Sequence, residues 1–414
     1  MKVLVALHDY LPLHAGGSEV HAHEVARELA RRGHTVSAAF TERDLGRQEG
    51  TVELGELDGV QTYELVHQRE YADARETWQQ APALAVFRRL LDEVRPDVVH
   101  FHHLSLWGSG AARAAKEAGA RVVLTLHDYH LICDNAVLLR SDHALCTDGP
   151  RGDCADCIRR HPVLTERWEN ATKDQAYARA ARERLEHHRA DLAHVDVAIA
   201  PSRFLGSVFR DAGLLRADQL VHFRYGYPGP RREPRASDPT QPLRVGYIGG
   251  IYPSKGVHVL VEAFEHLRDV EATLELRGHL DWFPSYVDEL RQRAAGLAVT
   301  FPGPFTRNEL DDVLARFDVL AVPSIWYENM PLTIQEAFRN GLPVVTTDLG
   351  GMAESVEDGV SGLLFPRGDA AALAGCVRRL AADRELLARL AAGRPHVPEL
   401  AEIVDRIEGL YGAE

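Results

Sequence analysis

Residues 319–338 read Val-Leu-Ala-Val-Pro-Ser-Ile-Trp-Tyr-Glu-Asn-Met-Pro-Leu-Thr-Ile-Gln-Glu-Ala-Phe. The first four residues form the short apolar run that is typical of a buried parallel strand. A turn at Pro323 and Ser324 follows. Pro331 suits the first turn of a helix, because a proline lacks the N–H that would have no partner there. The stretch therefore predicts a strand, a loop and a helix, the repeating unit of an α/β sheet.

The same alternation continues on both sides of this stretch. Short, mostly apolar runs recur at 3–7, 97–101, 121–126, 195–200, 243–248 and 272–277. A Pro-rich polar segment at 229–242 separates the two series and is typical of a linker. We expect two doubly wound, Rossmann-like α/β domains facing each other across a cleft, at 1–228 and 243–395. A C-terminal helix at 396–414 is expected to pack back on the first domain.

Composition excludes several kinds of protein. The 414 residues include 47 Lys and Arg against 61 Asp and Glu, which gives a formal net charge of −14. An acidic chain repels phosphate backbones, so we expect no nucleic-acid partner. No apolar run approaches the roughly 18 to 20 residues of a membrane span. The run at 3–7 is too short for a signal peptide, and five cysteines without an export signal indicate a reducing compartment. We therefore expect a cytoplasmic protein; peripheral attachment to a membrane and the oligomeric state stay open.

Two glutamates stand on either side of the start of the predicted helix. Helix N-termini collect free N–H groups and a positive dipole, which suit a diphosphate. Glu336, more than a turn into the helix, and Glu328, in the loop before it, can accept hydrogen bonds from hydroxyl groups. In the alternative interpretation Glu336 is a carboxylate on the helix surface and Glu328 is a partner of the helix dipole. These residues alone leave both interpretations open.

Two glycine-containing turns are candidate phosphate sites. Residues 249–256 read Gly-Gly-Ile-Tyr-Pro-Ser-Lys-Gly, between a predicted strand and a predicted helix. Their backbone can approach a phosphate closely, and Lys255 would neutralise it. Gly16 and Gly17 stand in the first turn between a strand and a helix, although their spacing is not that of a dinucleotide fingerprint. The alternatives are a turn with an exposed lysine and a turn with a plain helix cap.

His127 follows the predicted strand at 121–126. A histidine at this place can contact a sugar hydroxyl or a developing charge. The chain has 21 histidines, many of which will only satisfy local hydrogen bonds. These residues alone leave both interpretations of His127 open.

Four of the five cysteines lie within one loop region at 130–160. Two of them form a Cys-x-x-Cys knuckle of the type that grips zinc. A structural zinc site, free thiols and disulfides compete, with disulfides last because of the compartment. The four residues are Cys133, Cys146, Cys154 and Cys157.

A charged segment follows the cysteines. Arg159, Arg160 and the helical pattern at 174–189 are rich in arginine and glutamate. We interpret them as a solvated helical face, and the alternative is a patch for an anionic acceptor.

Together these motifs resemble the retaining glycosyltransferases of family 4, which have the GT-B fold. That family carries two glutamates with seven residues between them, and Glu328 and Glu336 have this spacing. The resemblance covers nearly the whole chain, because further motifs occur in the right order. They are Pro323-Ser324, Glu336-Ala337, Gly341-Leu-Pro-Val-Val, Gly350-Gly351, Glu354 and Asp358-Gly359-Val-Ser-Gly362-Leu-Leu-Phe.

The resemblance implies a role for each candidate residue. Glu336 would bind the ribose of the donor nucleotide. Glu328 would contact hydroxyls of the donor sugar, His127 would face that sugar, and Lys255 would bind a phosphate; these three would form the catalytic set. Backbone groups would meet the sugar and the diphosphate at Asn329, Met330, Pro331, Leu332 and Thr333.

The glycine-rich turns are also covered by the resemblance. The turn at Gly16 and Gly17 would lie against the donor phosphates and the acceptor. At the second turn the family usually has an arginine five residues before the lysine, and Gly250 stands there in this chain. Arg277 and Arg307 are candidates to replace that arginine.

The implied activity is transfer of a sugar from a UDP- or GDP-sugar, with retention of anomeric configuration. The acceptor is a glycan, a lipid-linked sugar or a small molecule that the sequence does not identify. No catalytic metal is expected, because helix N-termini and basic residues can stabilise a leaving diphosphate. The alternatives are a GT-B epimerase or phosphorylase, and a non-catalytic subunit that binds a nucleotide sugar.

Overall fold

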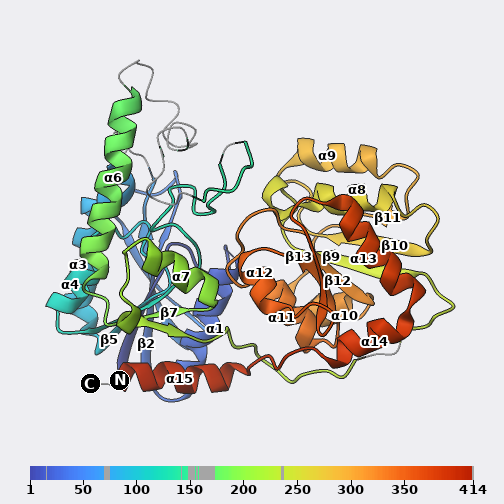
Figure 1. The fold of residues 1–414 in the computed structure, drawn as a ribbon. Helices are drawn as coiled ribbons and strands as arrows, with labels where there is room; N and C mark the ends of the chain where they lie inside the picture. Colours follow the sequence, from blue (N-terminus) through green and yellow to red (C-terminus); the bar gives the residue numbers. More distant parts are fainter. Residues whose placement is uncertain are drawn as a thin grey trace. The chain divides into compact units, whose positions relative to one another are not determined.

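The computed structural model describes residues 1–14, 16–69, 75–140, 142–147, 154, 157, 173–234 and 237–412. The chain forms two compact units (Figure 1). Unit 1 comprises Met1–Pro228 and Pro398–Glu414, and unit 2 comprises Gly229–Val397. Each unit is an open, mostly parallel sheet with helices packed against it, which confirms the predicted α/β fold class.

The sheet of unit 1 has the strand order β3-β4-β2-β1-β5-β6-β7-β8. Neighbouring strands are parallel, except that β3 and β4 are antiparallel. Val3 of the central strand lies opposite Val36 on one side and Val98 on the other, so the middle of the sheet is apolar. The strands are β1 Lys2–Ala6, β2 Thr35–Glu42, β3 Val52–Leu57, β4 Val60–Val66, β5 Val98–Phe101, β6 Arg121–Thr125, β7 Val197–Ala200 and β8 Leu220–His222.

Helices cover this sheet, and one of them comes from the end of the chain. Helix α15 packs on α1, and its apolar face lies in the same core as Val25 and Leu29. The hydroxyl of Tyr411, on α15, lies 2.8 Å from Nδ1 of the buried His100. The described helices are α1 Gly17–Arg31, α2 Glu76–Gln79, α3 Ala81–Val94, α4 Ala111–Glu117, α6 Lys173–Leu192, α7 Arg203–Asp211, α15 Leu400–Gly412 and the short 3-10 helix η2 Ala217–Gln219.

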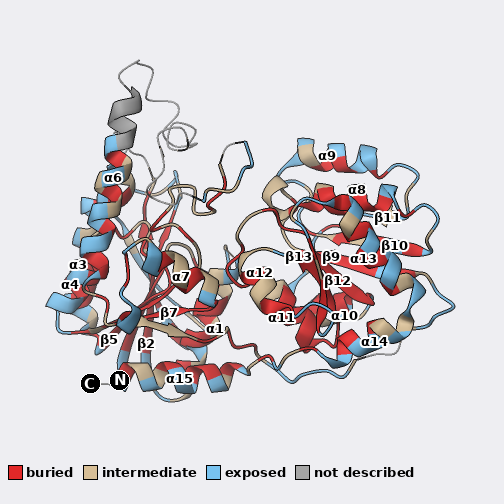
Figure 2. Cartoon of the chain, viewed as in Figure 1, coloured by how far each residue is buried: buried red, intermediate tan, exposed pale blue. Residues whose placement is uncertain are grey.

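The sheet of unit 2 is wholly parallel, with the order β11-β10-β9-β12-β13-β14. Most residues of its strands are buried, apart from those of the edge strand β11, whereas the outer face of α9 is exposed (Figure 2). The strands are β9 Leu243–Ile248, β10 Ala272–Arg277, β11 Val299–Thr300, β12 Val319–Val322, β13 Val344–Thr347 and β14 Gly362–Phe365. The helices are η3 Pro253–Lys255, α8 Val257–Glu265, α9 Pro284–Arg293, η4 Arg307–Glu309, α10 Leu310–Leu314, α11 Leu332–Arg339, α12 Gly350–Ser355, α13 Ala370–Ala382 and α14 Arg384–Ala392.

Each sheet has one point at which its strand order reverses. In unit 1 this point lies between β1 and β5, and in unit 2 it lies between β9 and β12. The loops that leave two such strands diverge to opposite sides, and ligands of doubly wound sheets bind there, at the carboxyl ends of the strands. The two switch points are therefore the places to look for function.

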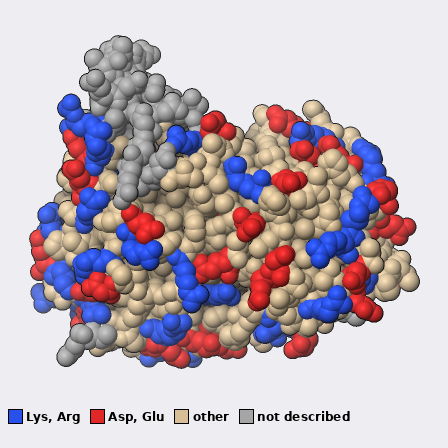
Figure 3. Space-filling view, viewed as in Figure 1, with Lys and Arg blue, Asp and Glu red and all other residues tan. Residues whose placement is uncertain are grey.

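Surface charge and helix hydropathy add two observations. Lys and Arg side chains are interspersed with Asp and Glu over the face of each unit that Figure 3 shows. Among the described helices, none is both long enough and apolar enough to traverse a lipid bilayer.

Candidate active site

The switch point of unit 2 brings together two loops that are about 70 residues apart in the sequence. Gly256 ends the first loop with a φ of +68°, and a side chain there would collide with the carbonyl oxygen of Pro323 in the second loop. The backbone N–H of Ile325 donates to the carbonyl of Ser254 at 2.9 Å. This close packing places the side chain before Gly256, Lys255, beside the second loop.

The carboxylate of Glu328 forms an ion pair with this lysine. Its Oε1 accepts hydrogen bonds from Lys255 Nζ at 2.6 Å, from Ser324 Oγ at 2.7 Å and from the indole N–H of Trp326 at 2.9 Å. No described group donates to the other oxygen, Oε2. The carboxylate is therefore fixed by three donors on one oxygen, and the second oxygen is available to a ligand.

Lys255 remains a cation in this setting. Burial alone would lower its pKa, but the Glu328 carboxylate and the neighbouring Tyr252 raise the pKa above its ordinary value. Its Nζ lies 5.4 Å from the ring centre of Trp326 and 5.9 Å from that of Tyr252. Two aromatic rings and a carboxylate thus frame one positive charge.

Helix α11 begins next to this pair. Pro331 stands at its N-cap, no side chain caps it, and its first turn contains no acidic residue. Asn329 and Met330, which precede it, are buried. The N–H of Gly351, at the start of α12, donates to the carbonyl of Glu328 at 3.0 Å and holds the loop in place. A helix N-terminus without its own acidic partner suits an external anion.

Glu336 lies further along α11, and only 4% of its surface is exposed. It is paired with Arg307 of η4, whose side chain is half exposed. Glu336 is thus a buried, ion-paired carboxylate and not a helix-surface one. Of the two arginines considered at the phosphate site, Arg277 pairs instead with Glu275 at 2.7 Å, so Arg307 is the one that lies beside a candidate site residue.

At Gly250 the structure shows what replaces a side chain. A Cβ atom there would lie 2.3 Å from the ring of Tyr252, so that ring fills the space. Tyr247 supports the arrangement, because its hydroxyl donates to the carbonyl of Gly250 at 2.6 Å. No larger residue fits at position 250 unless Tyr252 moves.

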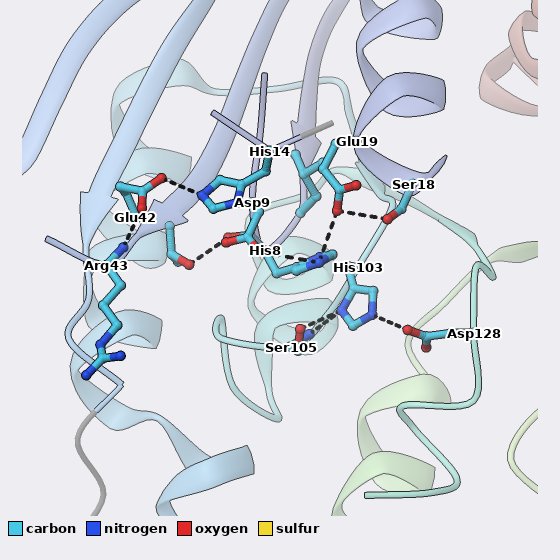
Figure 4. Close-up of polar contacts among 12 residues, drawn as sticks. His8, Asp9, His14, Ser18, Glu19, Glu42, Arg43, His103, Ser105 and Asp128 are labelled. Carbon is cyan, nitrogen blue, oxygen red and sulfur yellow. Dashed lines mark hydrogen bonds and ion pairs between the residues drawn. The ribbon is translucent and has the colours of Figure 1, made fainter. Parts of the chain in front are cut away.

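The switch point of unit 1 carries a different set of side chains. We call it the imidazole–carboxylate cluster, and it consists of His8, Asp9, Glu19, His103 and Asp128 (Figure 4). His8 Nε2 lies 3.1 Å from Glu19 Oε1, and His103 Nε2 lies 3.1 Å from Asp128 Oδ2. The rings of His8 and His103 are 4.3 Å apart. The cluster thus joins the ends of β1, β5 and β6.

His127 lies next to this cluster at the end of β6. Its Nδ1 is 2.7 Å from the hydroxyl of Tyr225, and its Nε2 is 3.1 Å from Nδ1 of His102. Burial and the neighbouring histidines hold the pKa of His127 well below its ordinary value, so the ring is neutral. Both ring nitrogens have protein partners. A ligand that uses this ring must therefore replace one of these contacts or bind its face.

The cysteines give no metal site within the described part of the chain, where no group of three or more His, Cys, Asp and Glu could hold an ion. Burial and the three neighbouring cysteines raise the pKa of Cys154 to about 11. Zinc at Cys133, Cys146, Cys154 and Cys157 stays a prediction. Arg159 and Arg160 lie outside the described residues.

Sequence reasoning did not single out several residues of both sites. Trp326 and Tyr252 lie beside the Lys255–Glu328 pair, and His8 and His103 belong to the cluster of unit 1. One signal was available for all four: each lies within a few residues of the carboxyl end of a strand at a switch point, where polar side chains point toward ligands.

Comparisons with known proteins agree on one family. Residues 15–221 match the family model described as Glycosyltransferase Family 4, and residues 242–383 match Glycosyl transferases group 1. A D-inositol 3-phosphate glycosyltransferase of Xylanimonas cellulosilytica is 30% identical over 412 residues, covering 92% of this chain and 86% of that protein. A glycogen synthase of Mycobacterium tuberculosis is 25% identical over 402 residues, with the same two coverages of 92% and 86%.

Solved structures share the fold. Anabaena HepE, crystallised with UDP and glucose, superposes with a TM-score of 0.67 at 20% identity, covering 99% of this chain and 98% of that one. Sucrose-phosphate synthase from Thermosynechococcus elongatus gives a TM-score of 0.70 at 19% identity, with coverages of 99% and 98%. At these identities the likeness concerns the arrangement of the backbone.

Proposed function

The chain belongs to glycosyltransferase family 4, and from this premise we propose that it transfers a sugar from a nucleoside-diphosphate sugar to a hydroxyl group of an acceptor, with retention of configuration. That it is a glycosyltransferase follows from the family. The donor class is supported by Anabaena HepE, which has the same fold and was crystallised with UDP-glucose. We propose that unit 2 binds the donor and unit 1 the acceptor.

The Lys255–Glu328 pair carries this proposal. The lysine ammonium has three N–H groups; Glu328 takes one of them, and Tyr252 is a second hydrogen-bond partner. The remaining N–H group can bind a diphosphate while the ion pair persists. Glu328 Oε2 can at the same time accept a hydrogen bond from a hydroxyl of the donor sugar. The Lys255–Glu328 pair can thereby contact both the diphosphate and the sugar of a nucleotide sugar.

The same geometry suits the departure of the diphosphate. Negative charge grows on the leaving phosphate as the glycosidic bond breaks, and preorganised positive groups stabilise that charge. Lys255 and the uncapped N-terminus of α11 provide them. We propose that the leaving phosphate also receives the proton of the attacking hydroxyl. Retention rests on the family.

Recognition of the nucleotide completes the assignment. Glu336 is buried and ionically paired on α11, whereas Glu328 lies in the loop before this helix. We propose that its carboxylate accepts hydrogen bonds from the ribose hydroxyls while Arg307 keeps it in position. Asn329 to Thr333 would then contact the diphosphate and the sugar through their backbone.

Hydrolysis of the donor in the absence of acceptor tests the function. Purified full-length protein is incubated with UDP-glucose, GDP-mannose or ADP-glucose, and release of the nucleoside diphosphate is measured. Slow release from one of them, together with thermal stabilisation by the matching diphosphate, is the expected result; a ligand at about 100 times its Kd stabilises by about 2.7 kcal/mol. Stabilisation without any release would favour a non-catalytic binding subunit. If the protein shows neither release nor stabilisation with any of the three nucleotides, the proposal is contradicted.

A further inference from the structure

The two switch points differ in how the nearest helix N-terminus is neutralised. In unit 2 helix α11 has no acidic residue in its first turn. In unit 1 helix α1 has Glu19 there. A carboxylate in the first turn already occupies the position that an anionic ligand would take. The two sites therefore differ in the charge that they can accept.

Glu19 folds back over the start of its own helix. A Cβ atom on Gly16 would lie 2.3 Å from Glu19 Oε2, so the glycine makes room for this carboxylate. Burial would raise the pKa of Glu19, but His8, its own backbone N–H and Ser18 together lower it. The carboxylate is thus ionised, and it closes the N-terminus of α1 to a second anion.

Two more carboxylates stand at the same place. Asp9 follows β1 and is paired with Arg69. Burial would raise the pKa of Asp128, but His103 and the N–H of His130 lower it, so this group is also ionised. Three carboxylates thus stand at the cluster, and the Arg69 guanidinium is already paired with one of them, Asp9.

Other charged groups also lie nearby. Burial would lower the pKa of His103, but Asp128, Glu19 and Asp9 raise it above its ordinary value, so this ring offsets part of the negative charge. Glu42, with His14 2.9 Å away, adds a further carboxylate. The guanidinium of Arg43 extends away from the cluster (Figure 4). A phosphate at this site would meet mainly like charge, which opposes its binding.

Open hydrogen-bonding positions remain at the cluster. His8 Nδ1 and His102 Nε2 are buried, and neither has a hydrogen-bond partner among the described residues. His102, only 1% exposed, lines a cavity of about 20 Å³ together with His103 and Asp128. Such a cavity holds about one water-sized group. A hydroxyl both donates and accepts, so it suits imidazole nitrogens and carboxylates alike.

We infer that the part of the acceptor bound by unit 1 is an uncharged, hydroxyl-bearing molecule such as a sugar, without a phosphate or carboxylate group. The inference rests on the proposed function and adds the chemical class of its acceptor. In unit 2, Lys255 and the start of α11 provide positive charge for a donor phosphate. The imidazole–carboxylate cluster recognises hydroxyl groups.

Matched pairs of acceptors test this inference. Full-length protein is given the donor that it hydrolyses, with D-glucose or D-glucose 6-phosphate, and with myo-inositol or myo-inositol 1-phosphate. Release of the nucleoside diphosphate and the mass of the product are measured. In at least one pair, the kcat/KM for the neutral compound should exceed that for its phosphorylated partner by roughly ten-fold or more.

Charge-neutralising variants provide the second arm. Glu19→Gln and, separately, Asp128→Asn should narrow the preference for the neutral member, because each removes one like charge from the site. Glu24→Gln, on the same helix but paired with Arg27, should leave the preference unchanged. Two independent variants keep the test valid if one of them folds poorly.

The outcomes separate this inference from the function on which it rests. Equal or better use of the phosphorylated members would overturn the inference. So would an enzyme that hydrolyses its donor but uses neither neutral compound. A protein that neither binds nor hydrolyses any nucleotide sugar would instead overturn the proposed function, and this inference with it.

Discussion

The indole N–H of Trp326 donates a hydrogen bond to Oε1 of Glu328 at 2.9 Å. The same indole ring lies 5.4 Å from the Lys255 ammonium. One aromatic side chain therefore contacts both members of the ion pair at the switch point. It holds the carboxylate by a hydrogen bond and covers the cation with its ring.

Trp326→Phe separates these two contacts, because phenylalanine keeps a ring but lacks the N–H. A hydrogen bond to a charged group contributes about 1.5–3 kcal/mol. We expect kcat to fall roughly ten-fold or more, and affinity for the free nucleoside diphosphate to change little. Steady-state kinetics measures kcat, and calorimetry measures the affinity for the nucleoside diphosphate. Trp282→Phe is the matched control, since Trp282 is exposed and lies against His279. A parallel loss of diphosphate affinity would show that Trp326 supports the phosphate site instead.

Lys255→Ala tests the phosphate site itself. Affinity for a nucleoside diphosphate should fall roughly ten-fold or more, because a charge-assisted hydrogen bond is lost, while affinity for the nucleoside stays close to native. Calorimetry with UDP and uridine, or with GDP and guanosine, measures both. Lys255→Arg should recover part of the diphosphate affinity. Lys116→Ala is the control, because Lys116 pairs with Asp196 on the surface of unit 1. Equal losses for diphosphate and nucleoside would place the lysine elsewhere.

The α/β alternation was predictable because buried parallel strands leave short apolar runs that turns and helices separate. The antiparallel hairpin of β3 and β4 was not identified. Its two-residue turn, Asp58-Gly59, has positive φ at both residues, and Asp-Gly is a strong hairpin signal. An alternation of buried strands and helices does not include this hairpin, since β3 is exposed along most of its length.

Residue pairs within the sites were harder to predict than their members. Lys255 and Glu328 could each be proposed from local sequence, whereas their contact depends on the packing of Gly256 against Pro323. The partner of Glu336 is Arg307, which lies 29 residues earlier on another element. Local periodicity contains no information about such distant contacts. The burial of the histidines of unit 1 was equally hard to predict, because it depends on which helices cover the sheet.

Buried histidines make unit 1 sensitive to acid. Burial lowers the pKa of His21 and of His100 to about 3, against an ordinary value of 6.5. Below pH 6.5 the unfolded chain therefore binds protons that the folded chain does not. The free energy of unfolding should fall as the pH drops toward 4, by about 1.4 kcal/mol per pH unit for each such histidine.

Urea unfolding at pH 7, 5.5 and 4.5 measures this slope. His100→Gln, which can keep hydrogen bonds to Thr125 and Tyr411, should make the slope shallower. His279→Gln should not, because the side chain of His279 is half exposed in unit 2. A native protein equally stable at pH 7 and 4.5 would contradict the neutral, buried state of these rings.

Glu336→Gln tests recognition of the ribose. The native carboxylate offers two acceptor oxygens to the vicinal hydroxyls, whereas the amide replaces one oxygen with a donor. Affinity for the nucleoside diphosphate should fall roughly ten-fold or more, because hydrogen bonds to a charged group are lost. Glu262→Gln, at an exposed carboxylate of α8 that pairs with Arg293, should have no such effect.

A 2′-deoxy nucleoside diphosphate separates ribose recognition from a general loss of structure around Glu336. The native protein should bind it several-fold more weakly than the ribonucleotide. The deoxy compound lacks one of the two hydroxyls that would donate a hydrogen bond to Glu336. In Glu336→Gln this difference should largely disappear, because the carboxylate that reads the hydroxyl is gone. Arg307→Met should act in the same direction if Arg307 positions the carboxylate, and Arg307→Lys should restore part of the discrimination. If the native protein and the Glu336 variant discriminate equally between the two nucleotides, Glu336 does not bind the ribose and its pairing with Arg307 is structural.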